Sequence, residues 1–117
     1  MHRAYNKHGF FSFAESGTRE LRCMQHGESE INTLCRVLEV SKREIQTREG
    51  KKKVIVHGII ADDTAKLPFV SGEEREELVK DNVVLIENAY ARRWKGLLTL
   101  YTGKDTTVRV IEEDIGY

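Results

Sequence analysis

The sequence predicts an all-β domain built as a small barrel, and three observations lead to this prediction. Segments within residues 31–111 alternate apolar and polar positions with a period of two, which is the pattern of half-buried strands. Turn-forming residues separate these segments at short intervals. At 117 residues, the chain has the size of one domain that can bury a core without disulfide staples. We therefore expect one barrel.

The first two predicted strands form a hairpin. Alternation from Ile31 to Thr47 indicates a long, bent first strand, and Arg48-Glu49-Gly50-Lys51 is typical of a tight turn. The second strand is predicted from Lys53 to Ala61. Gly58 lies in its middle, as expected where a small barrel coils sharply.

A third strand and a short helix should follow the Asp62-Asp63-Thr64 turn. The third strand is predicted from Lys66 to Val70, and Pro68 indicates an edge position or an outward-facing residue because proline has no N–H to donate. Ser71 has the spacing of a capping box with the glutamates that follow it. We therefore expect one helix from Glu73 to Val79.

The rest of the chain supplies the remaining strands. Alternating segments at Val83–Tyr90 and Leu97–Tyr101 flank a loop, Ala91–Gly96, and a last strand is expected from Thr106 to Ile111 after the turn at 103–105. Five or six short strands with one helix between the third and the fourth match the OB-fold, a five-stranded Greek-key barrel. Strand count alone leaves other small barrels open.

The charged residues cancel overall but are segregated along the chain. Lys and Arg total 19, and so do Asp and Glu. Basic residues cluster at 51–53 and 92–93, and acidic residues cluster at 73–77 and 112–114. A neutral total gives an anionic ligand no general attraction, so any such ligand needs a local basic face.

The most informative segment is the predicted loop Ala91–Gly96, which places three cations around the only tryptophan, Trp94. Such a loop offers a ring on which a base can stack and charges that neutralise phosphates. A hairpin with a solvated basic tip and a half-buried Trp is the structural alternative. The candidate stacking residues are Trp94, Tyr90 and Phe69, the candidate phosphate contacts are Arg92, Arg93, Lys95, Lys51, Lys52 and Lys53, and the candidate groove cations are Arg36, Arg43, Arg48, His57 and Lys66. The face on which Tyr101 lies depends on a register that the sequence leaves open.

Neither catalysis nor export is indicated. No phosphate-binding glycine motif, nucleophile elbow or HExxH motif is present, and the acidic pairs lie in a turn and a tail. Cys23 and Cys35 are too few for a disulfide framework, and no signal peptide or membrane-spanning apolar run appears. We expect a cytoplasmic binding protein that is not an enzyme and has no small-molecule substrate.

Particular residues resemble a known family, the OB domains of archaeal replication protein A. They are Arg36-Val37-Leu38-Glu39-Val40, Arg48-Glu49-Gly50, Ala61-Asp62-Asp63-Thr64, Ile86-Glu87-Asn88-Ala89-Tyr90, Trp94, Gly96, Gly103 and Glu112-Glu113-Asp114-Ile115. The resemblance implies binding of single-stranded DNA in replication, recombination and repair, beside other OB domains or subunits of a replication complex. It also implies binding without strict sequence preference and without catalysis. No cofactor is expected.

The chain departs from this family at several points. Members often carry an aromatic residue at the end of the third strand, where this chain has Val70-Ser71-Gly72, so that Phe69 is the nearest candidate. Their fourth strand tends to begin Gly-Asp-Val-Val-Arg, whereas this chain has Asp81-Asn82-Val83-Val84-Leu85 and lacks that cation. Weaker binding of single strands is the expected consequence.

The first thirty residues show no sustained period. Their segment Cys23-Met24-Gln25-His26 resembles the latter half of a zinc finger that precedes some archaeal OB domains, but the upstream Cys-x-x-Cys is absent, and His2 and His8 have no standard spacing to Cys23. A loop without zinc is therefore expected, and Cys35 is expected to be a buried structural thiol.

The resulting prediction divides the chain into two parts. Residues 1–30 form an extension or the remnant of a neighbouring module, and residues 31–115 form an OB domain that binds single-stranded DNA. One alternative is an OB domain kept for protein contacts or subunit assembly, which the neutral charge, the missing third-strand aromatic and the acidic helix favour, and an apolar patch on the face of that helix would mark its docking surface. The other is an OB domain that binds RNA, because stacking alone does not distinguish the two nucleic acids.

Overall fold

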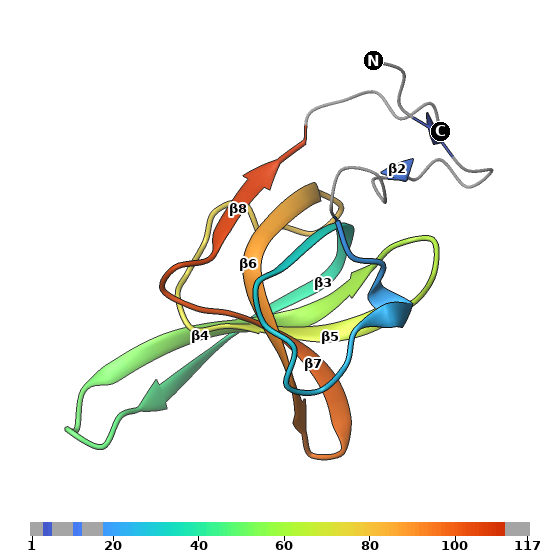
Figure 1. Cartoon of the computed structure of the whole chain (residues 1–117). Helices are drawn as coiled ribbons and strands as arrows, with labels where there is room; N and C mark the ends of the chain where they lie inside the picture. The colour runs from blue at the N-terminus through green and yellow to red at the C-terminus, as the bar shows by residue number, and fades with distance from the viewer. Residues whose placement is uncertain (1–3, 6–10, 13–17, 112–117) are drawn as a thin grey trace.

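The computed structural model describes residues 4–5, 11–12 and 18–111. Strands dominate this part of the chain, and a short 3-10 helix precedes the third of them (Figure 1). The elements are β1 (Ala4–Tyr5), β2 (Phe11–Ser12), η2 (Leu21–Cys23), β3 (Ile31–Gln46), β4 (Lys52–Ala61), β5 (Lys66–Ser71), β6 (Val83–Trp94), β7 (Leu97–Thr102) and β8 (Thr107–Val110). The short β1 and β2 pair only with each other.

Five strands close into a barrel. The hydrogen-bonded order is β3-β4-β5-β7-β6, and β6 also pairs with β3, so that the sheet has no free edge at this point. All these pairings are antiparallel except that of β5 with β7, which is parallel. β8 adds to the first half of β6. The OB-fold prediction is confirmed.

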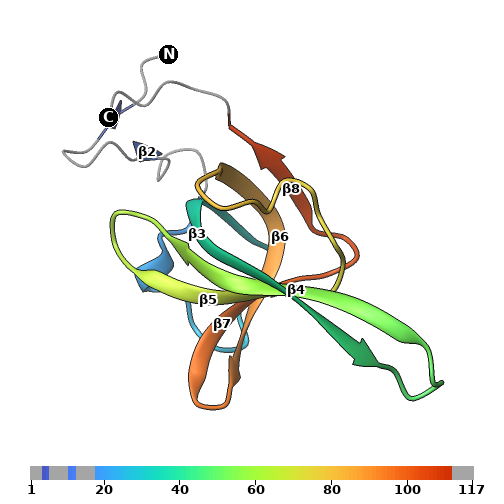
Figure 2. The same cartoon turned by 180° about the vertical axis from the view of Figure 1, so that it is seen from behind.

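Two hairpins project from the barrel in different directions (Figures 1 and 2). The first is the far part of the β3–β4 hairpin, residues 41–53, which we call the arm; the strand pairing continues to Gln46 and Lys52. The second joins β6 to β7. The sequence predicted a six-residue loop there, but the strands continue to Trp94 and from Leu97, so the loop contains only Lys95 and Gly96.

The predicted helix at Glu73–Val79 is absent, and turns replace it. Ser71 does not cap a helix; its hydroxyl donates to the Glu73 carbonyl oxygen at 2.7 Å. Arg75 donates from Nη2 to the Gly103 carbonyl oxygen at 2.9 Å, and Leu78 is buried in the core. A helix this short has too few backbone hydrogen bonds to offset its nucleation cost, so the contacts with the barrel decide the conformation.

A β-bulge bends β3 where it crosses β4. The pairing register shifts between Val37 and Glu39, and Gly58 lies opposite this irregularity. A Cβ atom on Gly58 would overlap the carbonyl oxygen of Glu39, so the backbones approach closely only because residue 58 has no side chain. This close approach lets β3 turn out of the barrel and continue as one strand of the arm.

A second irregularity reverses the inward and outward positions along β6. Val84 and Ile86 are buried, and so are Ala89 and Ala91, which have the opposite parity. Asn88 lies between the two pairs with a positive φ of 63°. Strict alternation would have turned Tyr90 inward with Ile86, whereas the irregularity leaves Tyr90 on the outer surface.

The edge position predicted for Pro68 has a structural counterpart. Pro68 pairs with Ile59 of β4, but the parallel pairing of β5 with β7 begins only at Phe69. One side of β5 is therefore unpaired at the proline, where no N–H is required.

Residues 18–30 pack onto the barrel. Leu21 and Met24 are buried in the core, and the Leu21 N–H donates to Asp62 Oδ2 at 2.9 Å. The Gly27 N–H donates to the Ala91 carbonyl oxygen, and the Ala91 N–H donates to the Glu28 carbonyl oxygen, both at 2.9 Å. Since this segment completes the core, we propose that the boundary of the barrel domain lies before Thr18 and not at residue 30.

Replacing Gly58 with Ala is expected to lower the free energy of unfolding by about 1–3 kcal/mol, because the added methyl group overpacks the β3–β4 crossing. Urea unfolding measures this change. Gly72→Ala is the matched control, because its Cβ would meet only Lys53 Nζ, at 3.7 Å. A Gly58→Ala variant as stable as the wild type would contradict the close approach.

Candidate functional site

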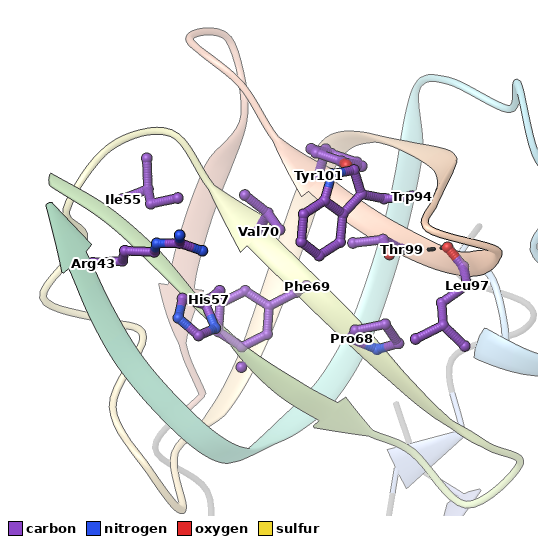
Figure 3. A pocket seen from close by; sticks show the side chains of 11 residues that line it. Arg43, Ile55, His57, Pro68, Phe69, Val70, Trp94, Leu97, Thr99 and Tyr101 are labelled. Atoms are coloured by element: carbon purple, nitrogen blue, oxygen red, sulfur yellow. Dashed lines mark hydrogen bonds between the residues drawn. The ribbon is translucent and has the colours of Figure 1, made fainter. Parts of the chain in front are cut away.

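The outer face of the barrel carries an apolar groove between the arm and the β6–β7 hairpin (Figure 3). It encloses a volume of about 300 Å³. Four strands supply most of its surface, and the base of the arm supplies one cation. The lining residues are Arg43, Ile55, His57, Gly58, Pro68, Phe69, Val70, Trp94, Leu97, Thr99 and Tyr101.

Trp94 stands at one end of the groove, at the tip of the β6–β7 hairpin. Lys95 and Gly96 have φ values of 52° and 82°, as a two-residue hairpin turn with the twist of the adjoining strands requires. This tight turn pairs Trp94 with Leu97 and leaves 48% of the Trp94 side chain exposed. Lys95 Nζ lies 4.5 Å from the centroid of the Trp94 rings. The hairpin therefore presents an accessible aromatic surface beside a cation.

A second aromatic group lies further along the same two strands. Tyr90 and Tyr101 are directly paired, and their rings stack with centroids 5.5 Å apart and planes 8° apart. The guanidinium carbon of Arg92 lies 5.0 Å from the Tyr90 centroid. Burial, and secondly the neighbouring Tyr90, raise the pKa of Tyr101 above its ordinary value of 10.0, so its hydroxyl is neutral at pH 7.

The electrostatic character of the groove is basic despite the neutral chain. Among the described residues that line it, Arg43 is a cation and none is a carboxylate. Arg92 and Lys95 are exposed next to its aromatic rings. A local basic face of the kind that the charge segregation allowed is therefore present.

The arm differs in charge between its two faces. Arg43 and Ile55 are paired and line the groove, and by alternation Ile45 and Lys53 continue the same face outward. On the opposite face, Lys42 Nζ lies 2.8 Å from Glu74 Oε2, and Lys52 Nζ lies 3.7 Å from Glu44 Oε1. Among the described residues, the carboxylates that pair with lysines of the arm lie on this second face.

Not all the residues predicted for the groove are accessible to a ligand there. Phe69 is only 1% exposed and forms part of the core, so in this structure its ring is inaccessible for stacking. Arg36 lies on a different part of the barrel, paired with Ala61 and Val83. Lys66 is exposed at the start of β5 but does not line the groove. Arg93 alternates with Arg92 and points away from the groove face.

Tyr101, whose face the sequence left open, lines the groove. The structure also adds groove residues that were not among the candidates, namely Ile55, Pro68, Val70, Leu97 and Thr99. Their apolar or neutral character gives no chemical signal in the sequence, and only their alternation with core positions marks them as outward. Arg43, by contrast, carried a signal as a cation near the turn of the first hairpin.

No group of three or more His, Cys, Asp or Glu side chains that could hold a metal ion occurs among the residues the structure describes. His26 Nδ1 accepts a hydrogen bond from the Arg93 backbone N–H at 2.9 Å, so this nitrogen has a structural partner. Cys35 is buried, and that burial, followed by the charge of Asp62, raises the pKa of its thiol. His2 and His8 lie outside the described residues.

Comparison with known proteins identifies similar chains, although no family model matches. The single-stranded DNA binding protein Ssb of Saccharolobus solfataricus is 34% identical over 86 residues, which are 72% of this chain and 57% of that protein. This chain thus spans little more than half the length of that relative.

Two solved structures show the same fold. The OB domain of a Thermoplasma acidophilum protein superimposes with a TM-score of 0.75 and 23% identity, over 86% of this chain and 92% of that one. The second OB-fold domain of replication protein A from Methanococcus maripaludis gives 0.67 and 16%, over 83% and 97%. The resemblance to archaeal replication protein A is confirmed.

These relatives agree with the reading of the chain as an OB domain without catalytic activity, since their names describe DNA-binding or OB-fold proteins and not enzymes. In the part of the chain that the structure describes, no helix is both long enough and apolar enough to cross a membrane.

Alkylation is expected to distinguish the two cysteines. Only the thiolate reacts, and burial keeps the Cys35 thiol protonated and inaccessible, whereas Cys23 is only partly buried. Native protein treated with iodoacetamide at pH 8 and analysed by mass spectrometry should carry the label mainly on Cys23, and protein unfolded in guanidinium should carry it on both. Equal labelling in the native protein would contradict the burial of Cys35.

Proposed function

We propose that this OB domain binds single-stranded DNA in the groove between the arm and the β6–β7 hairpin. The observation that carries this proposal is the half-exposed Trp94 at the end of an apolar groove, with Lys95 against its ring. Bases of any identity stack on such a ring, and the adjoining cations neutralise phosphates. The similar Saccharolobus protein, which is named for single-stranded DNA binding, supports the same function.

The phosphate contacts that we assign are Arg43, Arg92 and Lys95, together with Lys53 on the groove face of the arm. The backbone of a strand whose bases stack in the groove would pass along these cations. Roles in replication, recombination and repair, beside further OB domains in a longer protein or complex, are part of the proposal. They rest on the resemblance to archaeal replication protein A, of which one similar structure is the second OB-fold domain.

The alternative is a domain that contacts proteins, for which the neutral net charge, the missing third-strand aromatic and the acidic segment at 73–77 were the arguments. The docking surface expected for this alternative is the face of the predicted helix, and the structure has turns in that place. The groove is the more defined surface, so nucleic acid is the better-supported ligand. An RNA oligonucleotide of the same sequence, used as competitor, tests the choice between DNA and RNA.

Titration with a dT oligonucleotide of about 16 nucleotides, the upper range of OB site sizes, should quench Trp94 fluorescence to saturation. The four assigned phosphate contacts would give log K against log salt a slope of about −3, at roughly −0.7 per contact. Trp94→Ala, measured with a labelled oligonucleotide, should bind roughly 5- to 150-fold more weakly, since stacking is worth about 1–3 kcal/mol per base.

Thermal unfolding is the control for the Trp94→Ala variant, whose stability should change little because the ring is half exposed. If the wild type shows neither quenching nor a mobility shift of the oligonucleotide, the binding function is refuted and the protein-contact alternative takes its place.

The arm offers a matched pair of variants with the same charge change. Lys53→Gln should weaken binding and reduce the magnitude of the salt slope by about 0.7, because Lys53 lies on the groove face. Lys52→Gln should leave both quantities nearly unchanged, because Lys52 lies on the opposite face beside Glu44. Fluorescence anisotropy at several salt concentrations measures both. Equal effects of the two variants would contradict the sidedness of the arm.

A further inference from the structure

A row of four outward side chains crosses the barrel at the centre of the groove. The strand registers pair Tyr90 with Tyr101, Tyr101 with Val70, and Val70 with His57. Tyr101, Val70 and His57 all line the groove, and Figure 3 shows Val70 between the other two. The small side chain of Val70 is therefore flanked by the larger, flat rings of Tyr101 and His57.

Contacts around Tyr90 on β6 hold the Tyr90–Tyr101 pair in place. Tyr90 occupies one face of the Tyr101 ring in a nearly parallel stack. Tyr90 is itself confined by the Arg92 guanidinium and by Gly103, where a Cβ atom would lie 3.3 Å from Tyr90 Cε1. Because Tyr90 stacks on Tyr101 from the β6 side, the second face of the Tyr101 ring is turned toward its other neighbouring strand, β5, where Val70 is its register partner. Tyr101 is thus a supported ring with one face turned into the groove.

The spacing of the strands leaves room for one flat ring on that face. Tyr101 and His57 are two strands apart, a separation of about 9.5 Å at the usual spacing of 4.7–4.9 Å. A ring held between two others needs two carbon contact distances, about 7–8 Å. Val70 is half-buried and too short to fill this space. A slot open to the groove results.

We propose that Tyr101, Val70 and His57 form a nucleobase slot, in which a base of the bound strand stacks on Tyr101 above Val70. This inference rests on the proposed binding of single-stranded DNA and adds a second stacking position to the one at Trp94. A flat, mostly apolar ring matches the slot, because both walls are flat rings and the floor is an aliphatic side chain. The slot recognises stacking area, so it accepts every base.

Substitution of Tyr101 tests the slot. Tyr101→Leu should weaken binding of the dT oligonucleotide roughly 5- to 150-fold, and Tyr101→Phe, which keeps the ring, should bind within about 2-fold of the wild type. Trp94 fluorescence should still be quenched at saturation in both variants, because the first stacking position is intact. Thermal unfolding of each variant checks that the barrel is folded.

The two hypotheses fail in distinguishable ways. If the wild type does not bind the oligonucleotide, the proposed function is refuted and the slot with it. If the wild type binds and a folded Tyr101→Leu variant binds equally well, only the slot is refuted, and the tyrosine pair is then a cross-strand packing contact.

Photo-cross-linking of the unmodified protein gives an independent result that needs no variant. An oligonucleotide containing 5-iodouracil should cross-link to Tyr101 as well as to Trp94 on irradiation, and mass spectrometry of the digested complex locates both sites. Cross-links at Trp94 without any at Tyr101 would overturn the slot.

The coupling between the two tyrosines gives a further check. Because Tyr90 supports the ring of Tyr101, the double variant Tyr90→Leu/Tyr101→Leu should lose less affinity than the product of the two single losses. Losses that multiply fully would show that the two rings act independently and would contradict the paired arrangement.

Discussion

The pairing of β6 with β3 is the constraint on which the rest of this structure depends. It joins β3 to β6 from the pair Ile31↔Ala89 to the pair Arg36↔Val83, and thereby closes the barrel. Residues from both strands then enclose one core. Once β6 is fixed by this ladder, its far end extends beyond the barrel with β7 and carries Trp94 to the edge of the groove.

The segment before β3 extends that constraint toward the hairpin. Hydrogen bonds of Gly27 and Glu28 with Ala91 continue the line of the β3–β6 ladder, and His26 accepts from the Arg93 N–H one residue before Trp94. Backbone groups of β6 that would otherwise be unpaired are satisfied here. The position of Trp94 therefore depends on residues that the sequence pattern assigned to an extension.

Charge separation on the folded surface reconciles a neutral chain with an anionic ligand. The arm carries six cations and two carboxylates within residues 41–53, a net charge of +4. The remainder of the chain carries the compensating negative charge, including the acidic segment at 73–77. Glu44 of the arm and Glu74 of the acidic segment pair with Lys52 and Lys42 on the face of the arm that is turned away from the groove. The local field at the groove is thus more positive than the composition indicates.

The sequence by itself determined the strands, most of the turns and the fold class, because these depend on the local alternation of apolar residues and on turn chemistry. It also identified Trp94 with its neighbouring cations, since an aromatic residue within a basic segment is visible without any register. The predicted short helix at 73–79 was wrong because local sequence signals did not decide its conformation. The residues have the pattern of a capped helix, but contacts of Arg75 and Leu78 with the barrel outweigh it.

Only the tertiary structure decided which side chains face the groove. The irregularity at Asn88 turned Tyr90 outward, the register of the β3–β4 ladder placed Lys53 on the same face of the arm as Arg43, and core packing buried Phe69. The parallel pairing of β5 with β7 brought Tyr101 beside Val70. A shift of one residue reverses every side chain that follows it, and such shifts are set by pairing between distant strands, which a single sequence does not reveal.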